Sequence, residues 1–396
     1  MHKVIDEGIK NKEKYINRPQ VDKKFIEKAI EHVLKKIDQN LERYTHKFPT
    51  PASKNLVYGE IDNVDWTASF FTGMLWLAYE VTGDEKYKKV ADIHIKSFKH
   101  RLENRIEIDH HDIGFLYTLS CVASYKLTGN EEAKKIAIDA ADLLITRYYD
   151  KAEIIQAWGD LKDPAQRGRM IIDCNLNLPL LYWASEVTGD PKYHDIAYKH
   201  VKQAAKYLIR EDASTFHTYY MDPETGEPLY GNTKQGYSDD SCWARGQAWG
   251  IYGFPLSYVY TKDWELIEVS KKLTNYYLNR LPEDDICYWD LIFTDKDGEE
   301  RDSSAAAIAV CGILEMLKYL PVTDQYRMYY ENSALSMIQS LANDYTTELD
   351  SEANGLLLHG VYYKGGNSGV DESCIWGDYY YFEALVRALK DWELYW

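Results

Sequence analysis

The sequence predicts an all-α protein built from pairs of helices, and three observations support this prediction. From Val21 to Tyr44, apolar residues recur every three to four positions, which is typical of a helix with one buried stripe. Similar segments follow along most of the chain, whereas stretches with the period-two alternation of β-strands are few. A short element that ends one helix and begins the next also recurs, and it divides the chain into repeated units.

The repeated element combines a helix stop with a helix start. Its clearest copies are Ala78–Tyr87 (AYEVTGDEKY), Ser124–Ala133 (SYKLTGNEEA) and Ala184–Tyr193 (ASEVTGDPKY). In each copy a glycine can take the left-handed conformation that ends a helix, and the following Asp or Asn can cap the next helix. Weaker copies without the glycine lie at Ser257–Leu266 and Lys318–Tyr326. Each period of about 45 to 75 residues therefore holds roughly two helices and a loop.

The loops between these joints are long and unequal, and they collect polar and aromatic residues. They span Tyr58–Gly73, Asp109–Phe115, Trp158–Pro179, Phe216–Trp249, Tyr288–Ser304 and His359–Tyr381. An open helical solenoid would also contain helix pairs, but unequal loops favour a closed toroid whose loops build one active-site face. Because no linker rich in Pro, Gly or Ser interrupts the sequence, we expect residues 1–396 to form a single domain.

The composition limits the partners of the protein. Lys and Arg number 46 against 63 Asp and Glu, and the net charge of −17 argues against a general nucleic-acid or anionic-membrane binder. A small anionic substrate needs only a local cationic pocket and is compatible with this charge. Aromatic residues reach 14 %, and such side chains suit a carbohydrate site because they offer an apolar face and a polar edge.

The sequence also predicts a cytoplasmic protein, as a monomer or homodimer. The N-terminal stretch MHKVIDEGIKNKEKYINRPQ lacks the apolar run of a signal peptide, and no segment has the roughly 18 apolar residues of a membrane span. The cysteines are scattered without CxxC spacing, which is typical of reduced and mostly buried thiols. They are Cys121, Cys174, Cys242, Cys287, Cys311 and Cys374.

The segment Asp109–Asp112 (DHHD) is the first candidate for chemistry. A metal site is disfavoured, because adjacent histidines do not present two nitrogens to one ion and no further His, Glu or Cys cluster completes the shell. The following residues begin a helix well, so we expect Asp112 to be its N-cap. A capping carboxylate at the rim of a cavity can also serve a ligand.

Asp173 lies in an apolar frame, the segment MIIDCNLNLPL. Burial would raise the pKa of an unpaired carboxylate there, which is the property that a general acid near neutral pH requires. Pairing with Arg167, with Arg169 or with a helix N-terminus is an equal alternative from spacing alone. The neighbouring Cys174 is not expected to be a nucleophile, because no cysteine-centred signature surrounds it.

A third cluster extends from His217 through Gln235 to Trp249. Arg245 and Trp249 are four residues apart and therefore share one helix face. An arginine can bind a carboxylate with two hydrogen bonds, and a tryptophan offers a stacking surface. Together with Asp173 and the other tryptophans, the cluster favours a carbohydrate site over a structural ion pair. The chain has no G-x-S-x-G elbow, Walker A motif or G-x-G-x-x-G motif, which argues against a serine hydrolase and against nucleotide cofactors.

Six motifs in order resemble the unsaturated glucuronyl hydrolases, glycoside hydrolase family 88. They are WTASFFTGMLWLAYEVTGD (Trp66–Asp84), HHDIGFLY (His110–Tyr117), GRMIIDCNLNLPLLYWA (Gly168–Ala184), HTYY (His217–Tyr220), KQGYSDDSCWARGQAWGIYG (Lys234–Gly253) and WGDYYYFEAL (Trp376–Leu385). No single motif is decisive, but six in sequence are specific. The resemblance covers most of the chain and implies a six-hairpin (α/α)6 barrel, in agreement with the repeated joints.

The resemblance also implies a reaction. Such enzymes remove the 4,5-unsaturated uronic acid that polysaccharide lyases leave at the non-reducing end of glycosaminoglycan oligosaccharides, and they hydrate its double bond instead of displacing at the anomeric carbon. Carried over, Asp173 would be the general acid and base, and Asp112 the second essential acid, bound to sugar hydroxyls. The implied substrate-binding residues are Trp66, His111, Trp158, His217, Gln235, Arg245, Trp249, Lys364 and Ser368. No metal and no cofactor is implied.

One loop departs from the family pattern. In members that prefer sulfated fragments, this loop resembles the pattern S-x-x-S-x-K. Here His359–Trp376 reads HGVYYKGGNSGVDESCIW, with Lys364, Asn367 and Ser368 in a different spacing. Chondroitin, hyaluronan and heparin-type fragments therefore stay open as substrates. Three other functions also stay open: an unsaturated rhamnogalacturonyl hydrolase acting on pectin, a sugar epimerase on a similar barrel, and a non-catalytic sugar-binding protein.

Overall fold

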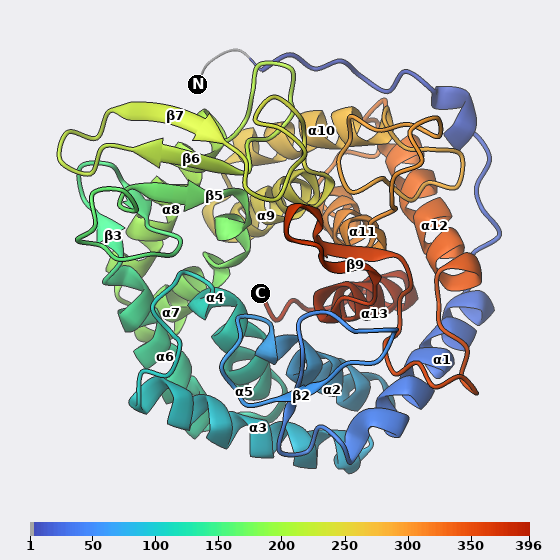
Figure 1. Cartoon of the computed structure of the whole chain (residues 1–396), viewed down its shortest axis with the longest axis horizontal. Coiled ribbons are helices and arrows are strands. Elements are labelled where there is room, and N and C mark those ends of the chain that lie inside the picture. The colour runs from blue at the N-terminus through green and yellow to red at the C-terminus, as the bar shows by residue number, and fades with distance from the viewer. Residues whose placement is uncertain (1–3) are drawn as a thin grey trace.

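Helical hairpins arranged in a closed ring form the structure, a computed structural model that describes residues 4–396 (Figure 1). Residues 1–3 of the predicted domain lie outside the described part. The inner helices are α2 (Ala68–Thr82), α4 (Ile113–Tyr117) continued by the π-helix η2 (Thr118–Val122) and α5 (Ala123–Thr128), α7 (Pro179–Thr188), α9 (Ala244–Thr261), α11 (Ser303–Leu317) and α13 (Ile375–Leu389). The outer helices are α3 (Glu85–Glu103), α6 (Glu131–Ile145), α8 (Pro191–Tyr207), α10 (Trp264–Leu278), α12 (Arg327–Asp344) and α1 (Lys23–Leu41), which packs on α13 and closes the ring. Across residues 4–396 these pairs make six hairpins, so the predicted (α/α)6 barrel is confirmed.

Burial separates the inner helices from the outer ones. In α11 every residue from Ser303 to Ile313 is buried, because neighbouring helices cover it on all sides. Gly312 lets α11 approach α9 closely, since a Cβ at this position would lie 2.6 Å from the Cα of Tyr252. The outer helix α1 buries one main stripe, which the spacing of its apolar residues predicts, and this stripe includes Ile26, Ile30, Val33 and Ile37.

The predicted joints connect inner helices to outer helices. Three inner helices end on a glycine in the left-handed conformation, at Gly83, Gly129 and Gly189. At each joint the next residue accepts a backbone N–H of the outer helix, through Asp84, Asn130 and Asp190. At these three joints the predicted structure is confirmed: a glycine in the left-handed conformation ends the inner helix, and the next side chain caps the outer helix.

The two weaker copies of the joint differ from each other. Lys262 takes the left-handed conformation with a φ of 56°, and Asp263 caps α10, so this joint forms without a glycine. Lys318 instead keeps the right-handed conformation with a φ of −60°, and the chain leaves α11 through Pro321. The left-handed conformation strains a lysine, because its Cβ crowds the backbone.

Small antiparallel sheets occupy the long loops on the inner helices' N-terminal side. β1 (Phe48–Pro49) pairs with β2 (Glu60–Ile61), β3 (Tyr148–Tyr149) with β4 (Ile154–Ile155), and β8 (Gly360–Tyr363) with β9 (Ser368–Glu372). A three-stranded sheet joins β5 (Arg169–Ile171), β6 (Thr218–Met221) and β7 (Pro228–Asn232). The pairing of β5 with β6 continues in a hydrogen bond from the Ile172 N–H to the His217 carbonyl, 3.1 Å long, and so holds two candidate segments together.

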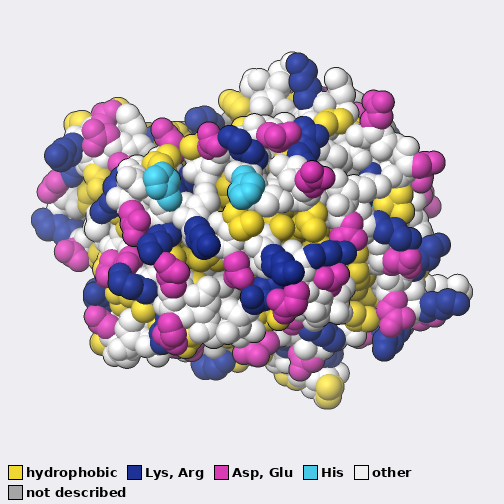
Figure 2. Space-filling model, turned by 90° about the horizontal axis from the view of Figure 1, so that it is seen from below, with side chains coloured by type: hydrophobic (Ala, Val, Ile, Leu, Met, Phe, Trp, Pro, Cys, Tyr) yellow, Lys and Arg dark blue, Asp and Glu magenta, His cyan; other side chains and the backbone are white. Residues whose placement is uncertain are grey.

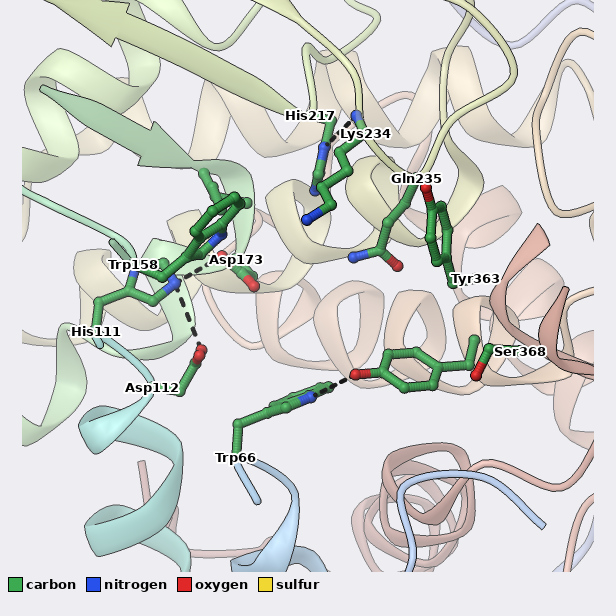
Figure 3. Close-up of a pocket in the computed structure, with 12 residues that line it drawn as sticks. Trp66, His111, Asp112, Trp158, Asp173, His217, Lys234, Gln235, Tyr363 and Ser368 are labelled. Carbon is green, nitrogen blue, oxygen red and sulfur yellow. Dashed lines mark hydrogen bonds and ion pairs between the residues drawn. The ribbon is translucent and has the colours of Figure 1, made fainter. Parts of the chain in front are cut away.

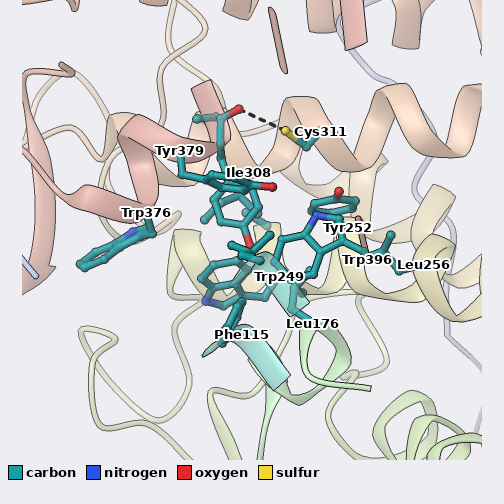
Figure 4. Close-up of a cluster of buried hydrophobic side chains, with 14 of the residues drawn as sticks. Phe115, Leu176, Trp249, Tyr252, Leu256, Ile308, Cys311, Trp376, Tyr379 and Trp396 are labelled. Carbon is teal, nitrogen blue, oxygen red and sulfur yellow. Dashed lines mark hydrogen bonds between the residues drawn. The ribbon is translucent and has the colours of Figure 1, made fainter. Parts of the chain in front are cut away.

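Aromatic side chains fill the centre of the ring beneath these loops (Figure 4). The ring of Trp249 lies 5.5 Å from Phe115 and 5.5 Å from Tyr380, and Trp396 stacks on Tyr380 at 6.0 Å between centroids. We call Phe115, Trp249, Tyr380 and Trp396 the aromatic floor. The indole of Trp396 is fully buried and donates its N–H to Glu383 at 2.9 Å.

Charged side chains of both signs cover one face of the molecule. Figure 2 shows basic and acidic side chains interspersed over one whole face, without a continuous basic patch in that view. Among residues 4–396, no helix has the length and apolar character to cross a membrane. The cysteines at positions 121, 174, 242, 287, 311 and 374 are buried free thiols, as predicted.

Replacing Lys262 with glycine should raise the free energy of unfolding by about 1 kcal/mol, because glycine takes the left-handed conformation without strain at its Cβ. The matched change Gly83→Ala should lower the free energy of unfolding by about 1 kcal/mol. A Cβ at Gly83 meets no atom within 4 Å, so this loss would report backbone conformation alone. Equilibrium denaturation of both variants measures the two changes, and equal stability of all three proteins would contradict the joint's proposed origin.

Candidate active site

A cavity of about 320 Å³ opens among the loops on the N-terminal side of the inner helices (Figure 3). Trp66 precedes α2, Asp112 precedes α4, and Asp173 lies in the short helix η3 (Ile172–Leu176) before α7. The lining residues are Trp66, His111, Asp112, Trp158, Ile171, Asp173, His217, Lys234, Gln235, Tyr362, Tyr363 and Ser368. Residues far apart in sequence thus meet because the ring brings the beginnings of its inner helices together.

One buried imidazole lies between two carboxylates in this cavity. Nε2 of His111 is 3.4 Å from Oδ1 of Asp112 and 3.3 Å from Oδ1 of Asp173. Asp112 stands at the predicted N-cap position of α4, but its side chain makes no capping hydrogen bond. It faces His111 and also lies 3.3 Å from Nδ1 of His110. The carboxylate is therefore directed at the cavity instead of the helix.

The surroundings shift the pKa values of the two carboxyl groups in opposite directions. Burial raises the pKa of Asp173, and the nearby Asp112 charge adds to this shift, although His111 opposes it. Burial would also raise the pKa of Asp112, but His111 and His110 outweigh it and lower this pKa. The pKa of His111 is raised, because the two carboxylates together outweigh the effect of its own burial. Asp112 is thus held ionised while Asp173 retains a proton more readily, a division of roles typical of acid–base sites.

The alternative partners proposed for Asp173 are engaged elsewhere. Arg167 pairs with Glu224, and Arg169 donates from Nε to the hydroxyl of Tyr220 at 3.0 Å. Oδ1 of Asp173 is buried and accepts no hydrogen bond from any described residue. Neither arginine therefore pairs with Asp173, and its ion-pair contact among the described residues is instead with Nε2 of His111 at 3.3 Å.

The opposite wall of the cavity presents hydrogen-bond donors. Nδ1 of His217 accepts the backbone N–H of Lys234 at 2.9 Å, so the ring proton belongs on Nε2, which faces the cavity. Burial, with help from the nearby cations Arg245 and Lys234, lowers the pKa of His217 to about 3, so the imidazole is neutral. Oε1 of Gln235 accepts from Arg245 at 2.8 Å, which leaves its NH₂ group to donate to a ligand.

Two tryptophans form apolar surfaces in the cavity wall. The indole N–H of Trp66 donates to the hydroxyl of Tyr362 at 3.1 Å, which fixes the ring orientation. The guanidinium of Arg169 lies 3.6 Å from the ring centre of Trp158, and the ammonium of Lys234 lies 4.5 Å from it. These contacts hold both rings in place, and rigid aromatic faces are suited to stacking on sugar rings.

Three predicted binding residues lie outside the cavity lining. Arg245 is buried beneath Gln235 and donates to Asp302, to the carbonyls of Val361 and Tyr362, and to Gln235 itself. Trp249 belongs to the aromatic floor. Lys364 forms ion pairs with Glu299 and Glu300. The other predicted residues, namely Trp66, His111, Asp112, Trp158, Asp173, His217, Gln235 and Ser368, do line the cavity.

The cavity also contains residues that the sequence did not single out. Lys234 adjoins Gln235, and Tyr362 and Tyr363 are the last residues of the β8 strand, inside a segment already marked as polar and aromatic. Their proximity to marked residues was a signal, but nothing in the spacing distinguished the cavity-facing lysine, Lys234, from Lys364. Ile171 adds an apolar contact beside Asp173.

The same three side chains could together hold a metal ion. The donor atoms of His111, Asp112 and Asp173 all lie within 4.8 Å of one another, so Asp173 supplies a third potential ligand that the sequence did not reveal. A catalytic zinc site uses three protein ligands. However, the raised pKa of His111 means that a metal ion would have to displace the proton of the ring in order to bind. Without a metal ion, the same three side chains form an imidazolium held between two acids.

Comparison with known proteins gives consistent results. The sequence model described as Glycosyl Hydrolase Family 88 matches residues 30–315. The chain is 52 % identical over 390 residues to the unsaturated chondroitin disaccharide hydrolase of Streptococcus agalactiae, covering 98 % of each protein. It is 44 % identical over 370 residues to the unsaturated glucuronyl hydrolase of a Bacillus species, covering 93 % of this chain and 98 % of the relative.

Solved structures agree with the sequence matches. The crystal structure of unsaturated glucuronyl hydrolase from Streptococcus agalactiae superposes with a TM-score of 0.98 at 52 % identity, covering 100 % of both chains. A variant of that enzyme complexed with dGlcA-GalNAc6S superposes with a TM-score of 0.90 at 50 % identity, covering 100 % of this chain and 99 % of that one. An unsaturated glucuronyl hydrolase specific for heparin gives 0.84 at 29 % identity, covering 92 % and 97 %.

The opposite pKa shifts predict opposite effects of two amide substitutions on stability. A raised pKa means that Asp173 lowers stability as the pH rises above the ordinary aspartate pKa, because the unfolded chain then loses the proton that the folded protein keeps. Asp173→Asn should therefore raise the thermal midpoint at neutral pH and not under acidic conditions. A lowered pKa means that ionised Asp112 stabilises the fold above the ordinary aspartate pKa, so Asp112→Asn should lower the midpoint at neutral pH. Thermal unfolding between about pH 4 and pH 8 would measure shifts of about 1–4 °C. Shifts of the same sign for both variants would contradict the assignment.

Proposed function

The chain belongs to glycosyl hydrolase family 88, and from this premise we propose that it removes the 4,5-unsaturated uronic acid from lyase-generated glycosaminoglycan disaccharides, with unsaturated chondroitin disaccharide as its substrate. It is an unsaturated glucuronyl hydrolase and thus a glycoside hydrolase. The observation that carries the proposal is the single imidazole between two carboxyl groups of opposite pKa shift, at the bottom of a tryptophan-lined cavity.

In the first step, Asp173 acts as a general acid on the C4=C5 double bond. The π electrons of the double bond take the carboxyl proton, so that a C4–H bond forms and the O–H bond of Asp173 breaks. Positive charge develops on C5 and is shared with the ring oxygen. Protonating carbon near neutral pH requires an acid that keeps its proton, and burial beside the ionised Asp112 gives Asp173 this property.

In the second step, Asp173 acts as the base. Its carboxylate takes a proton from a water molecule whose oxygen adds to C5, which restores the acid and leaves a hemiketal at C5. The ring opens when the C5–O5 bond breaks, as the C5 hydroxyl becomes a ketone and its proton passes to O5. The resulting hemiacetal at C1 then becomes an aldehyde, and its hydroxyl proton passes to the glycosidic oxygen that leaves with the second sugar. One water molecule is consumed, and no external reductant or oxidant is needed.

The other cavity residues hold the sugar. Asp112, kept ionised by His111, accepts hydrogen bonds from sugar hydroxyls and favours the positive charge that develops at C5. Trp66 and Trp158 offer apolar faces to the sugar rings, while His217 and Gln235 donate from the opposite wall. Ser368 lines the edge formed by β8 and β9.

Arg245 has an indirect place in this proposal. Its hydrogen bonds to Gln235 and to the carbonyls of Val361 and Tyr362 join the donor wall to the β8 strand, and its ion pair with Asp302, 3.0 Å long, joins α9 to α11. We therefore assign it a positioning role. Trp249 acts through the aromatic floor in the same way.

We also propose that the enzyme works in the cytoplasm as a single domain, as a monomer or homodimer. Buried, unpaired thiols at all six cysteine positions support a reducing compartment. The charge of −17 supports a solvent-exposed exterior without a polyanion-binding surface.

Purified enzyme should abolish the ultraviolet absorbance of the conjugated double bond in an unsaturated chondroitin disaccharide and release the free amino sugar. Asp173→Asn should lower kcat by about 10²–10⁴-fold with an unchanged Kd for the disaccharide, because the amide keeps the shape but has no acidic proton. Continuous absorbance kinetics and calorimetric titration of the variant measure the two quantities. Full activity of the variant, or loss of its binding, would contradict the role of Asp173.

The substrate class is tested with a panel. Pectin-derived unsaturated disaccharides should be turned over more slowly than those from chondroitin, and faster turnover would favour a rhamnogalacturonyl hydrolase. Persistent absorbance on every fragment would refute hydration, and conversion of a reducing sugar without cleavage would then identify an epimerase. Binding without any turnover would identify a sugar-binding protein.

Zinc should inhibit the enzyme, and a chelator should leave its activity unchanged. A divalent cation between His111, Asp112 and Asp173 would hold Asp173 ionised and remove the proton that the first step needs. Initial rates after dialysis against EDTA, and with added zinc chloride, measure both effects. Activity that falls with EDTA and returns with zinc would contradict a metal-free acid.

A further inference from the structure

Lys234 places a positive charge in the wall of the cavity that no acidic side chain neutralises. Its side chain points into the cavity (Figure 3), and within residues 4–396 its ammonium forms no ion pair with a carboxylate. The ammonium rests 4.5 Å from the ring centre of Trp158, and the backbone N–H of the same residue donates to His217. Both contacts hold the lysine in place before any ligand binds.

The other cations near the cavity are already engaged. Arg245 is buried and pairs with Asp302. Arg169 lies behind Trp158 and donates to Tyr220. Lys364, which the sequence marked for an anionic group, is neutralised by Glu299 and Glu300. Among these four basic residues, Lys234 is the one that lines the cavity and has its charge available.

Two neutral donors face the cavity beside this ammonium. Nε2–H of His217 and the NH₂ group of Gln235 lie on the same wall as Lys234, opposite Asp112 and Trp66 (Figure 3). One cation flanked by two N–H donors matches the needs of a carboxylate, whose two oxygens accept several hydrogen bonds. The ionised Asp112 on the other side would repel the same group.

We infer that Lys234 binds the C6 carboxylate of the unsaturated uronic acid, with His217 and Gln235 completing the site. This inference rests on the proposed function and names the residue that selects an acidic sugar. The carboxylate is attached to C5, next to the C4 atom that Asp173 protonates, so anchoring it on the donor wall orients the double bond toward the acid. The ion pair between Lys234 and the carboxylate exists both in the bound substrate and in the transition state. Lys234 therefore contributes to substrate affinity more than to the chemical step.

The test crosses two enzymes with two substrates. The enzymes are wild type and Lys234→Met, which keeps the length of the side chain and removes the charge. The substrates are the unsaturated chondroitin disaccharide and the methyl ester of its uronate carboxyl group. For the acid, Lys234→Met should raise KM by roughly 10- to 100-fold with a nearly unchanged kcat. For the ester, the two enzymes should have similar kcat/KM, because the ester has no charge for the lysine to bind.

Two further variants control the measurement. Lys234→Arg keeps a cation and should retain most of the discrimination between acid and ester. Lys206→Met removes an exposed lysine at the end of the outer helix α8 and should behave as wild type. Thermal unfolding checks that each variant is folded under the assay conditions.

The outcomes separate the inference from the function on which it rests. If Lys234→Met lowered kcat/KM equally for the acid and the ester, the role of Lys234 would be overturned and the proposed hydrolase function would stand. A loss seen with a sulfated disaccharide and absent with its unsulfated form would also overturn it, since the lysine would then recognise the sulfate. Failure of the wild-type enzyme to act on the acid would instead refute the proposed function.

Discussion

The chemistry of this protein depends on one imidazole that lies within 3.4 Å of two carboxyl groups. Two neighbouring carboxyl groups in a buried site do not both ionise readily. The group that lies closer to positive charge is the one that ionises. His111 and His110 both contact Asp112, whereas Asp173 has only His111 and an apolar frame. This asymmetry is enough to make one group an acid and its neighbour an anion without any difference in residue type.

The ring of helices brings these groups together by collecting the beginnings of its inner helices at one place. Asp112 stands before α4 and Asp173 before α7, and Asp302 caps α11 while it pairs with Arg245 of α9. The N-terminal end of a helix favours negative charge, because its free N–H groups carry a partial positive charge. A closed ring therefore offers several such ends to one cavity, which helps an anionic chain accept an anionic substrate.

The sequence predicted the architecture better than the direction of individual side chains. Helix stops such as Gly83 are local signals, and the expected joints formed even where Lys262 replaces glycine, with the exception of the weak copy at Lys318, which stays right-handed. The acids were also visible, because a charged residue in an apolar segment stands out. Arg245 was placed on a helix face correctly, but spacing does not tell whether a face meets the cavity or a neighbouring helix, so its bonds to Asp302 and Val361 were not foreseen. The choice between Lys234 and Lys364 likewise depends on the acidic partners Glu299 and Glu300, which come from another loop.

The raised pKa of Asp173 has a structural requirement below the cavity. An acid in contact with water on every side would ionise near its ordinary pKa, so water must be kept out from beneath it. The aromatic floor serves this purpose. The ring of Trp249 lies 5.5 Å from Phe115 and 5.5 Å from Tyr380, and Trp396 stacks on Tyr380 at 6.0 Å. Beneath it, Arg387 bridges Glu383 and Glu315 at 2.9 Å and 2.6 Å, so the charges buried there are paired. Burying the carboxyl group of Asp173 costs free energy of folding. Packing in the centre of the barrel, away from the reacting groups, offsets this cost.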